Sequence, residues 1–543
     1  MANEGVDLTV FITMAIIFIV ITLLLGWYGH KNTQDNDSYL LGRKKTNSVI
    51  IALSYGATFL SASAVIGFGG QAAVHGATLM WLCFLNMSVG LIVAFIVFGR
   101  PTRRLGKKLG ALTFADLLGK IYKSRGIRLF TALLIIIMMP IYCAAVLKGG
   151  VNSLAVITGL DYNVMLLILS VIVAVYVVYG GVIAVMYNDA FQAVIMFVGM
   201  VVIFIVTMSS VGLDGFQQLT DLKVSGALEQ TGVLPGANGW TMFAELGSDE
   251  WLTVVTTFLL GVGIGALTQP QLVVRFMSAK DEKTLNRSMI IGSIFIFVIV
   301  GAAYTCGTLC NLYFYNEYGV NAVTYVTNGV DFIIPTFIVE VFRNVTFGDV
   351  FVSLFLVSLI CASISTISGL MHTIGVARGY DLYESYKERK HKEELKKSSL
   401  WYSRVFTVIM MVLVVIYCYL MPSDIIAKAT SVFMGITAAA LLPTYIYGLY
   451  AKNPIKKAAH ISIVTGTLTY LFWALFINAG TSIFLPICNL ITGQKVLFVG
   501  SSISFVDALV VALPVSILAM VISVLYYRAK STTETEPVAE AQA

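Results

Sequence analysis

The sequence predicts an all-α integral membrane protein of about thirteen transmembrane helices, in which two sets of five helices form an inverted repeat. Three observations support this fold class. Of the 543 residues, 58% are hydrophobic and only 12% are charged, which lies outside the range of soluble globular chains. Apolar runs long enough to cross a bilayer recur along the chain, separated by short polar connections. Two of these runs are interrupted by glycine and hydroxyl residues at matching positions.

Each apolar run is matched to the hydrocarbon core of a bilayer, which needs roughly 20 helical residues. The first run lacks a basic leading segment and a cleavage site, so we expect it to stay as a helix. The odd number of runs places the two termini on opposite sides. The predicted spans are residues 9–28, 48–74, 77–99, 127–156, 162–182, 187–212, 251–278, 287–314, 347–379, 400–420, 424–449, 458–478 and 503–527.

Basic residues are unevenly distributed among the connections between these spans. Lysine and arginine gather in alternate connections, for example in residues 100–125 and 280–287, whereas the long loops 213–250 and 315–346 hold few of them. Cytoplasmic connections keep such an excess of positive charge. We therefore expect a multi-pass plasma-membrane protein with its N-terminus outside and its C-terminus inside.

The remaining polar segments complete the predicted organisation. The charged run 384–397 is expected to be a solvated orienting loop, with a binding surface for anionic lipid headgroups as the alternative. Asn344 begins a glycosylation sequon on the outer side. The predicted parts are a first helix and loop (1–47), a first repeat (48–212), an external loop (213–250), a second repeat (251–450), two further helices (451–530) and a disordered tail (531–543).

Other function classes lack their characteristic residues. The net charge of +6 comes from residues between spans, which argues against nucleic acid as a partner. The seven cysteines form no CxxC pair and the five histidines form no HExxH motif, so an enzyme is not indicated. A channel would need a continuous polar pore. The expected partners are the lipid bilayer, a coupling ion and a small-molecule solute.

The two interrupted spans carry the functional argument. Residues 53–70 and 260–271 contain glycine and hydroxyl residues in place of a continuous apolar helix. If spans two to six and seven to eleven are repeats, each interrupted helix opens its own repeat. Half-helix ends and freed carbonyl groups then create a central site for solute and ion. The alternative is that small residues only let helices pack closely.

Four motifs match one known family in order along the chain. They are Tyr39-Leu-Leu-Gly-Arg43, residues 179–185 with Asn188-Asp189-Ala-Phe-Gln192, residues 269–276, and residues 362–368. With these motifs the chain resembles the sodium/solute symporter family over roughly residues 10 to 450, and its residues 57–67 look most like the pantothenate and monocarboxylate branch. The resemblance implies a five-plus-five inverted-repeat (LeuT-like) core, Na⁺ as the coupling ion, and import of a small organic solute by alternating access.

The resemblance implies a sodium site between the first interruption and the ninth span. A hard cation prefers oxygen ligands, and neighbouring hydroxyl groups supply them without burying a net charge. In the alternative reading, these hydroxyl groups bond to carbonyl groups one turn earlier in their own helix. The implied ligands are the backbone carbonyl groups of Ala57, Leu60 and Ala362 and the hydroxyl groups of Ser365 and Thr366.

Asp189 is a further candidate, because an acidic residue at membrane depth is costly unless it has a function. Some family members use this aspartate with hydroxyl groups of the ninth span for a second ion or for the exit route of the ion. Ser365 and Ser368 could serve here, but Gly369 stands where a two-sodium member offers another hydroxyl group. A second sodium ion is therefore not expected. The alternative is that Asp189 caps a helix or pairs with an arginine on the inner side.

The solute is expected at the two interruptions. Sugar-carrying relatives place Glu, Gln, Asn and bulky aromatic residues there, whereas this chain has Ser63, Ala64, Val262 and Gly265. Proline-carrying relatives have an aspartate where Phe59 stands. The candidate solute contacts are Thr58, Ser61, Ala62 and Ser63 in the first interruption and Gly265, Thr268 and Gln269 in the second.

We therefore expect a carboxylate, either a monocarboxylate or a pantothenate-like acid. A proline-like amino acid or a sugar is the alternative, followed by a proton-coupled carrier or an ion channel. The partial positive charge at the N-terminus of a half-helix could receive the carboxylate. Lys148 could add a cationic contact or snorkel to the outer surface. His372 could couple protons or only pack and form a hydrogen bond.

Overall fold

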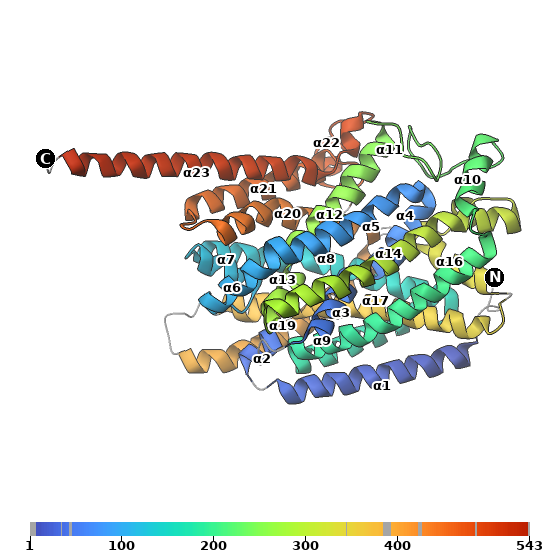
Figure 1. The fold of residues 1–543 in the computed structure, drawn as a ribbon, viewed down its shortest axis with the longest axis horizontal. Coiled ribbons are helices and arrows are strands. Elements are labelled where there is room, and N and C mark those ends of the chain that lie inside the picture. The colour runs from blue at the N-terminus through green and yellow to red at the C-terminus, as the bar shows by residue number, and fades with distance from the viewer. Residues whose placement is uncertain are drawn as a thin grey trace.

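The computed structural model describes residues 7–33, 35–42, 46–343, 345–383, 392–421, 426–483 and 486–540. The regular structure of this described part is helical and includes no β-strand, as expected of a chain whose backbone groups must be satisfied inside a bilayer. The helices form one elongated bundle (Figure 1).

Length and hydropathy identify eleven candidate spans within the described residues, two fewer than the thirteen predicted. The difference arises because two pairs of predicted spans, 48–74 with 77–99 and 162–182 with 187–212, are each counted as one candidate. The first part of the span 48–74 is a separate, shorter apolar helix, Ser48–Phe59. The candidates are Leu8–Asn32, Ser63–Leu109, Arg125–Thr158, Tyr162–Val211, Asp249–Thr268, Glu282–Tyr318, Gly348–Leu382, Leu400–Leu420, Ile426–Tyr450, Lys456–Phe476 and Ala508–Lys530.

Both joined pairs turn at a glycine. Gly76 has φ 75° and ψ −158°, and Gly181 has φ 58° and ψ −154°. Only glycine adopts this region without strain. Gly181 divides α9 (Tyr162–Val211) into two helices across a kink. A straight helix of 50 residues would be about 75 Å long, more than twice the hydrocarbon core, so the kink is needed to fit the segment into a membrane.

The first interruption lies at residues 60–62. Helix α3 (Ser48–Phe59) ends there, and Leu60 leaves the helical region with φ −91° and ψ 77°. The chain resumes as a π-helical turn, η2 (Ser63–Gly67), and continues as α4 (Phe68–His75). The predicted interruption within residues 53–70 is therefore present.

The second interruption lies at residues 266–269. The chain enters through α11 (Asp249–Leu252), η5 (Thr253–Leu260) and α12 (Gly261–Gly265). A single 3₁₀ turn, η6 (Ala266–Thr268), follows, and Gln269 is extended with φ −69° and ψ 115°. Helix α13 (Pro270–Ser278) then begins with a proline, whose missing N–H group is not needed in a first helical turn.

Helix α17 (Gly348–Val376) lies at the centre of the bundle, packed against α3, α9 and α8 (Arg125–Thr158). Glycines allow this close packing. A Cβ atom at Gly150 of α8 or at Gly199 of α9 would lie 2.2 Å from the Oγ atom of Ser363 or Ser358. Hydroxyl residues of α17 are thereby held deep in the molecule beside the first interruption.

The two interrupted spans are connected to each other at both ends of the bundle. A parallel β-bridge joins Thr46, just before α3, to Ala279, just after α13. At the other end, the Nδ1 atom of His75 lies 2.5 Å from Oε1 of Glu250, which joins the end of α4 to α11. The Nε1–H group of Trp240 also donates to the carbonyl oxygen of Ala73, so the preceding loop caps α4.

The ends of the bundle differ in charge. We call the end with α2 (Asn36–Leu41), α6 (Arg100–Leu109) and α7 (Phe114–Ile121) the basic side, and the end with loops 212–248 and 319–347 the loop side. The N-terminal end of the described chain lies at the loop side and its C-terminal end at the basic side (Figure 1). Residues 43–45, 344 and 384–391, which carried sequence predictions, lie outside the described residues.

Peripheral helices surround this core. Helix α1 (Leu8–Asn32) lies along α9, while α21 (Lys456–Phe476) and α23 (Ala508–Glu540) pair and pack on α20 (Ile426–Tyr450) (Figure 1). Helix α23 extends to Glu540, into the segment for which the sequence predicts a disordered tail. The other long or named helices are α5 (Met80–Met87), η4 (Ser88–Gly99), α10 (Gly215–Val224), α14 (Glu282–Tyr318), α15 (Ala322–Tyr325), α16 (Ile333–Phe342), η8 (Ala377–Leu382), α19 (Lys392–Leu420) and α22 (Ile487–Thr492).

Helix ends on the basic side are fixed by charged side chains. The carboxylate of Asp281 accepts a hydrogen bond of 2.7 Å from the backbone N–H of Thr284 and caps α14. This bond lowers the pKa of that exposed carboxyl group. Arg104 of α6 donates two hydrogen bonds, 2.6 and 2.9 Å long, to Glu282 in the first turn of α14.

Candidate functional site

Oxygen atoms of the first interruption and of α17 meet at the centre of the bundle. The Oγ atom of Ser365 lies 3.0 Å from the carbonyl oxygen of Ala57 and 3.2 Å from that of Ala362. The Oγ1 atom of Thr366 lies 3.1 Å from the carbonyl oxygen of Thr58. All five residues are buried. We call these atoms the oxygen cluster; they are uncharged oxygens, the ligand type that a hard cation takes.

The cluster contains four of the five residues that the sequence proposed as sodium ligands. Leu60 is the residue at which α3 ends, and the structure instead places the carbonyl group of Thr58 against α17. Ser365 contacts Ala362 within its own helix as well as Ala57 in α3. The contact with Ala362 is the bond within its own helix that the alternative reading predicts, and the contact with Ala57 brings the hydroxyl group to the first interrupted span.

A buried ion pair lies beside the oxygen cluster. The Nη2 atom of Arg275 on α13 lies 2.9 Å from Oδ2 of Asp189 on α9, and both side chains are almost fully buried. The sequence analysis quoted Arg275 within a motif but gave it no role. A role could have been inferred, because an arginine in the short helix that follows the second interruption would need a partner for its charge at membrane depth. The structure thus shows the alternative role of Asp189, pairing with an arginine.

Hydroxyl groups complete the shell of Asp189. Ser54 and Thr58 donate to its Oδ2 atom at 2.8 and 3.1 Å, and Ser368 donates to Oδ1 at 3.3 Å. The guanidinium group of Arg275 in turn donates to the hydroxyl oxygens of Thr58 and Ser54, at 2.9 and 3.2 Å. Thr58 therefore links the oxygen cluster, through its carbonyl group, to the ion pair, through its hydroxyl group.

Gly369 provides space for this ion pair. A Cβ atom at position 369 would lie 3.0 Å from Cγ2 of Thr58 and 3.3 Å from Nη2 of Arg275. A residue with a hydroxyl side chain would compete with the guanidinium group for this volume. In the family pattern, position 369 would offer another ligand to an ion. Here the guanidinium group of Arg275 lies beside this position instead.

A small cavity lies beside the first interruption, on the loop side of the ion pair. The hydroxyl oxygens of Ser61 and Tyr142 are 3.2 Å apart, and those of Ser63 and Thr430 are 2.9 Å apart. Among the described residues, the hydroxyl group of Tyr304 and the Oδ1 atom of Asn86 have no hydrogen-bond partner. We call this space the solute cavity; its lining is Phe59, Leu60, Ser61, Ser63, Ala64, Phe68, Asn86, Tyr142, Val262, Tyr304, Thr430 and Met434.

Only part of the predicted solute set faces this cavity. Ser61 and Ser63 line it, whereas the side chain of Thr58 points to the ion pair. Gln269 donates at 2.9 Å both to the carbonyl oxygen of Gly265 and to Oγ1 of Thr437, so it holds α20 against the second interruption. Ala62, Gly265 and Thr268 are buried beside the interruptions but do not line the solute cavity.

Four polar lining residues were not identified from the sequence. Asn86 could have been, because it is a polar residue within the apolar run 77–99. Tyr142, Tyr304 and Thr430 come from three different helices, and nothing in their local sequence separates them from other residues of buried spans. Only the packing of α8, α14 and α20 around the first interruption brings them together.

The two single candidates of the sequence analysis lie elsewhere. Lys148 of α8 donates to the carbonyl oxygen of Met421, beyond the end of α19, and does not line the solute cavity. His372 lies one turn beyond Ser368 on α17, and its Nε2 atom is 3.0 Å from the carbonyl oxygen of Tyr39. A hydrogen-bonding role for His372 is thus what the geometry shows.

Interrupted helices that place uncharged oxygens and a small polar cavity at the centre of a membrane bundle define an ion-coupled secondary transporter. The family model described as "Sodium:solute symporter family" matches residues 39–466. The chain belongs to the sodium:solute symporter family. It is therefore a sodium-coupled transporter of a small solute and not an enzyme.

Curated relatives share most of their length with this chain. It is 26% identical to sodium/proline symporter 2 of Staphylococcus saprophyticus, over 87% of each chain. It is 25% identical to the osmoregulated proline transporter OpuE of Bacillus subtilis, over 86% of this chain and 89% of the relative. The sodium/proline symporter of Staphylococcus aureus is 25% identical over 86% of both chains.

Solved structures share the fold. A Na⁺-coupled sialic acid symporter in a substrate-bound, outward-open state superposes with a TM-score of 0.71 at 17% identity, covering 94% of this chain and 96% of that one. Mhp1, a nucleobase-cation-symport-1 family transporter, gives a TM-score of 0.50 at 13% identity, covering 90% and 95%. The predicted all-α fold with a five-plus-five inverted-repeat (LeuT-like) core is confirmed.

Proposed function

We propose that the chain imports a small carboxylate-bearing solute together with sodium, with the basic side facing the cytoplasm. The observation that carries the choice of solute is the lining of the solute cavity. It combines aromatic rings with hydroxyl and amide groups and includes no acidic or basic side chain. Such a lining suits a compact solute with one polar head and an apolar body.

The sodium ion is proposed to bind at the oxygen cluster. Its ligands are the carbonyl groups of Ala57, Leu60 and Ala362 and the hydroxyl groups of Ser365 and Thr366. The carbonyl group of Thr58 is a possible substitute for that of Leu60, because it already faces Thr366. An ion held here would fix the end of α3, and Ser61 in the solute cavity follows within one helical turn. Ion and solute sites therefore share one short segment, which is a physical route for coupling.

The carboxylate is proposed to bind hydroxyl donors of the cavity. Tyr304 lies in the lining with an unpaired hydroxyl group, and Tyr142 shares its hydroxyl group with Ser61. Ser61 precedes η2 and Ser63 is its first residue, and the aligned peptide groups at the start of a helix also favour a negative charge. These groups can receive a carboxylate without a fixed positive residue.

Proline is the second candidate, and it is favoured by the relatives, which are named as proline transporters. Proline is itself a small carboxylate with an apolar ring, so it meets the same requirements. Phe59, which lines the cavity, differs from the aspartate expected in proline carriers and would leave the proline amine without an acidic partner.

The experiment is uptake by purified protein in proteoliposomes. Radiolabelled monocarboxylates, pantothenate, proline and sugars are supplied singly with an inward sodium gradient, and with potassium in place of sodium as the control. We expect sodium-dependent uptake of a monocarboxylate or of proline. Sodium-dependent uptake of a sugar alone, or equal uptake in potassium, would contradict the proposal.

Two serine variants test whether the cavity is the binding site. Ser63→Ala removes a hydroxyl group from the lining and is expected to raise KM for the solute roughly 5- to 10-fold, the value of one hydrogen bond. Ser462→Ala removes an equally buried hydroxyl group at the contact of α21 with α23 and is expected to leave KM unchanged. Equal effects of the two variants would argue against the cavity.

A further inference from the structure

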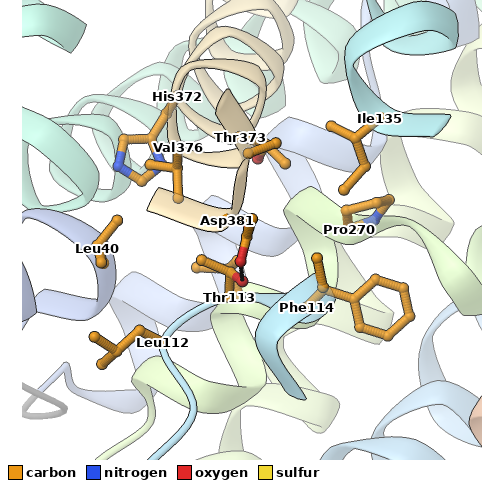
Figure 2. A pocket seen from close by; sticks show the side chains of 13 residues that line it. Leu40, Leu112, Thr113, Phe114, Ile135, Pro270, His372, Thr373, Val376 and Asp381 are labelled. Carbon is orange, nitrogen blue, oxygen red and sulfur yellow. Dashed lines mark hydrogen bonds between the residues drawn. The ribbon is translucent and has the colours of Figure 1, made fainter. Parts of the chain in front are cut away.

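A second cavity lies on the basic side of the oxygen cluster, along the direction in which an ion or solute would leave. One wall is α17 from His372 onward, one turn beyond Ser368, and another is α13 directly after the second interruption, at Pro270 and Val274. We call it the basic-side cavity. Its lining is Leu40, Leu112, Thr113, Phe114, Ala115, Ile135, Pro270, Val274, His372, Thr373, Val376, Ala377 and Asp381 (Figure 2).

The short helix α2 closes one side of this cavity. Its last three side chains, Tyr39, Leu40 and Leu41, are only 1%, 3% and 0% exposed, although they belong to a six-residue helix in a connection between spans. Leu40 lines the cavity together with Leu112, and Figure 2 shows both on the side away from Pro270 and Ile135. These three residues open a motif that the sequence analysis singled out without giving it a role.

A defined set of contacts holds α2 against the centre of the bundle. The Nε2 atom of His372 lies 3.0 Å from the carbonyl oxygen of Tyr39, and the two rings are 5.2 Å apart. The ring of Tyr39 fills the kink of α9, where a Cβ atom at Gly181 would lie 2.5 Å from it. The guanidinium carbon of Arg404 on α19 also lies over this ring, 5.8 Å from its centroid.

The opposite wall is held by charged side chains. Asp381 accepts hydrogen bonds from Thr113 at 2.8 Å and from Arg128 at 3.1 Å (Figure 2 marks the first of these). Arg128 also lies 3.6 Å from Asp116 of α7. This network joins α7 and α8 to η8, which follows α17. The contacts of α2 with α17 include the hydrogen bond between His372 and Tyr39 and the packing of their rings.

The segment after α2 connects it to the interrupted spans. Gly42 ends α2 in the left-handed region, with φ 61° and ψ 32°. Thr46 then forms the β-bridge to Ala279 at the end of α13. This bridge joins the start of α3 to the end of α13, on the same side of the bundle as α2.

We propose that α2 is a gate that closes the transport pathway on the basic side, with Leu40 as its plug and His372 as the residue that positions it. The inference rests on the chain being a transporter and is independent of its solute and of the proposed orientation. It predicts that α2 leaves the basic-side cavity when the pathway opens to this side.

The test measures access to the cavity with a cysteine reporter. Thr373→Cys is suitable because Thr373 lines the cavity and its hydroxyl group bonds within its own helix, to Gly369. The seven native cysteines are buried, so they give little background. A small charged thiol reagent is added to the basic side of sealed vesicles that contain the full chain in sodium. In this background, Leu40→Ala is expected to raise the labelling rate about tenfold by shifting the gate toward its open state.

Two further variants separate gating from general loosening. Leu40→Met keeps the side-chain volume and is expected to label at the rate of the parent. His372→Leu removes the donor to Tyr39 and is expected to raise the rate several-fold. A second reporter, Thr78→Cys in the cavity beside His75 on the loop side, is expected to show no rise in either gate variant.

The outcomes are distinct. An unchanged rate at Thr373→Cys in both Leu40→Ala and His372→Leu would overturn the proposal, as would an equal rise at the two reporters. Size-exclusion profiles identify a variant that fails to fold. If either Leu40→Ala or His372→Leu fails, the labelling rate of the remaining one decides the result. No solute is added, so a wrong choice of solute cannot change the result.

Discussion

At the scale of single residues, the ion pair of Asp189 and Arg275 is the most demanding feature of the molecule. Moving two charges into a low-dielectric interior costs several kcal/mol for each ion, and the cost is recovered only if the partners stay together and their remaining hydrogen bonds are made. Ser54, Thr58 and Ser368 make those bonds. The pair therefore depends on α3, α9, α13 and α17 holding their places at once.

Breaking this pair is expected to destabilise the protein strongly. Arg275→Gln or Asp189→Asn leaves one buried charge without its partner and should cost about 3–5 kcal/mol, read as a large fall of the thermal unfolding midpoint in detergent. The double variant removes both charges and should recover part of the loss. Arg104→Gln is the matched control, because the pair with Glu282 is exposed and should contribute less than about 1 kcal/mol. A double variant no more stable than either single one would contradict this account.

The hydroxyl groups of the oxygen cluster are expected to set the sodium requirement. Ser365→Ala or Thr366→Ala removes one uncharged ligand and should raise the sodium concentration for half-maximal uptake roughly 5- to 10-fold. Thr366→Ser keeps the hydroxyl group and should stay near the wild type. Sodium activation of uptake is the measurement, and wild-type activation in both alanine variants would remove these residues from the sodium site.

At the scale of elements, the turns at Gly76 and Gly181 decide how the chain is folded into the membrane. Gly181→Ala places a Cβ atom 2.5 Å from the ring of Tyr39 in a backbone region that other residues avoid, so it should lower stability by more than about 3 kcal/mol. Gly110→Ala is the control, since Gly110 has φ 61° but no atom within 4 Å of the added carbon, and should cost only about 1 kcal/mol. Equal unfolding temperatures for the two variants would contradict the packing argument.

The helices and their interruptions also show which structural features can be predicted from the sequence. Apolar runs and the glycine interruptions are local, and they were predicted at residues 53–70 and 260–271, where the structure has them. The sequence placed Gly76 between two separate spans and Gly181 inside the span 162–182, because hydropathy does not show where a helix kinks at a glycine or that it continues beyond the kink. Tyr142, Tyr304 and Thr430 could not be assigned, because their role arises from the packing of three distant helices and leaves no local pattern.

The pairing of Asp189 illustrates the limit at the candidate site. The cost of a buried acid is visible in the sequence, so a partner or a function could be expected. Which arginine supplies the charge depends on how α13 returns beside α9 after the second interruption. The sequence motif contained Arg275, but the distance of 2.9 Å that gives it a role is a tertiary fact.

At the scale of the whole molecule, the distribution of basic residues predicts the orientation in the membrane. A single cysteine at Leu213, which is 88% exposed on the loop side, should react with an impermeant thiol reagent added to intact cells. A cysteine at Lys452 on the basic side should react only after the membrane is opened. The native cysteines are buried and provide the blank. The reverse pattern would invert the proposed orientation.

The neutrality of the oxygen cluster has an electrical consequence. Carbonyl and hydroxyl groups add no charge of their own, and the charges of Asp189 and Arg275 cancel, so the binding region of the empty carrier is neutral. With one sodium ion and a zwitterion such as proline, the loaded form carries one positive charge, and a membrane voltage drives it with about 2.3 kcal/mol per 100 mV. With one sodium ion and a monocarboxylate the charges sum to zero, and voltage leaves the rate unchanged. A current recorded during uptake therefore reports which kind of acid is carried.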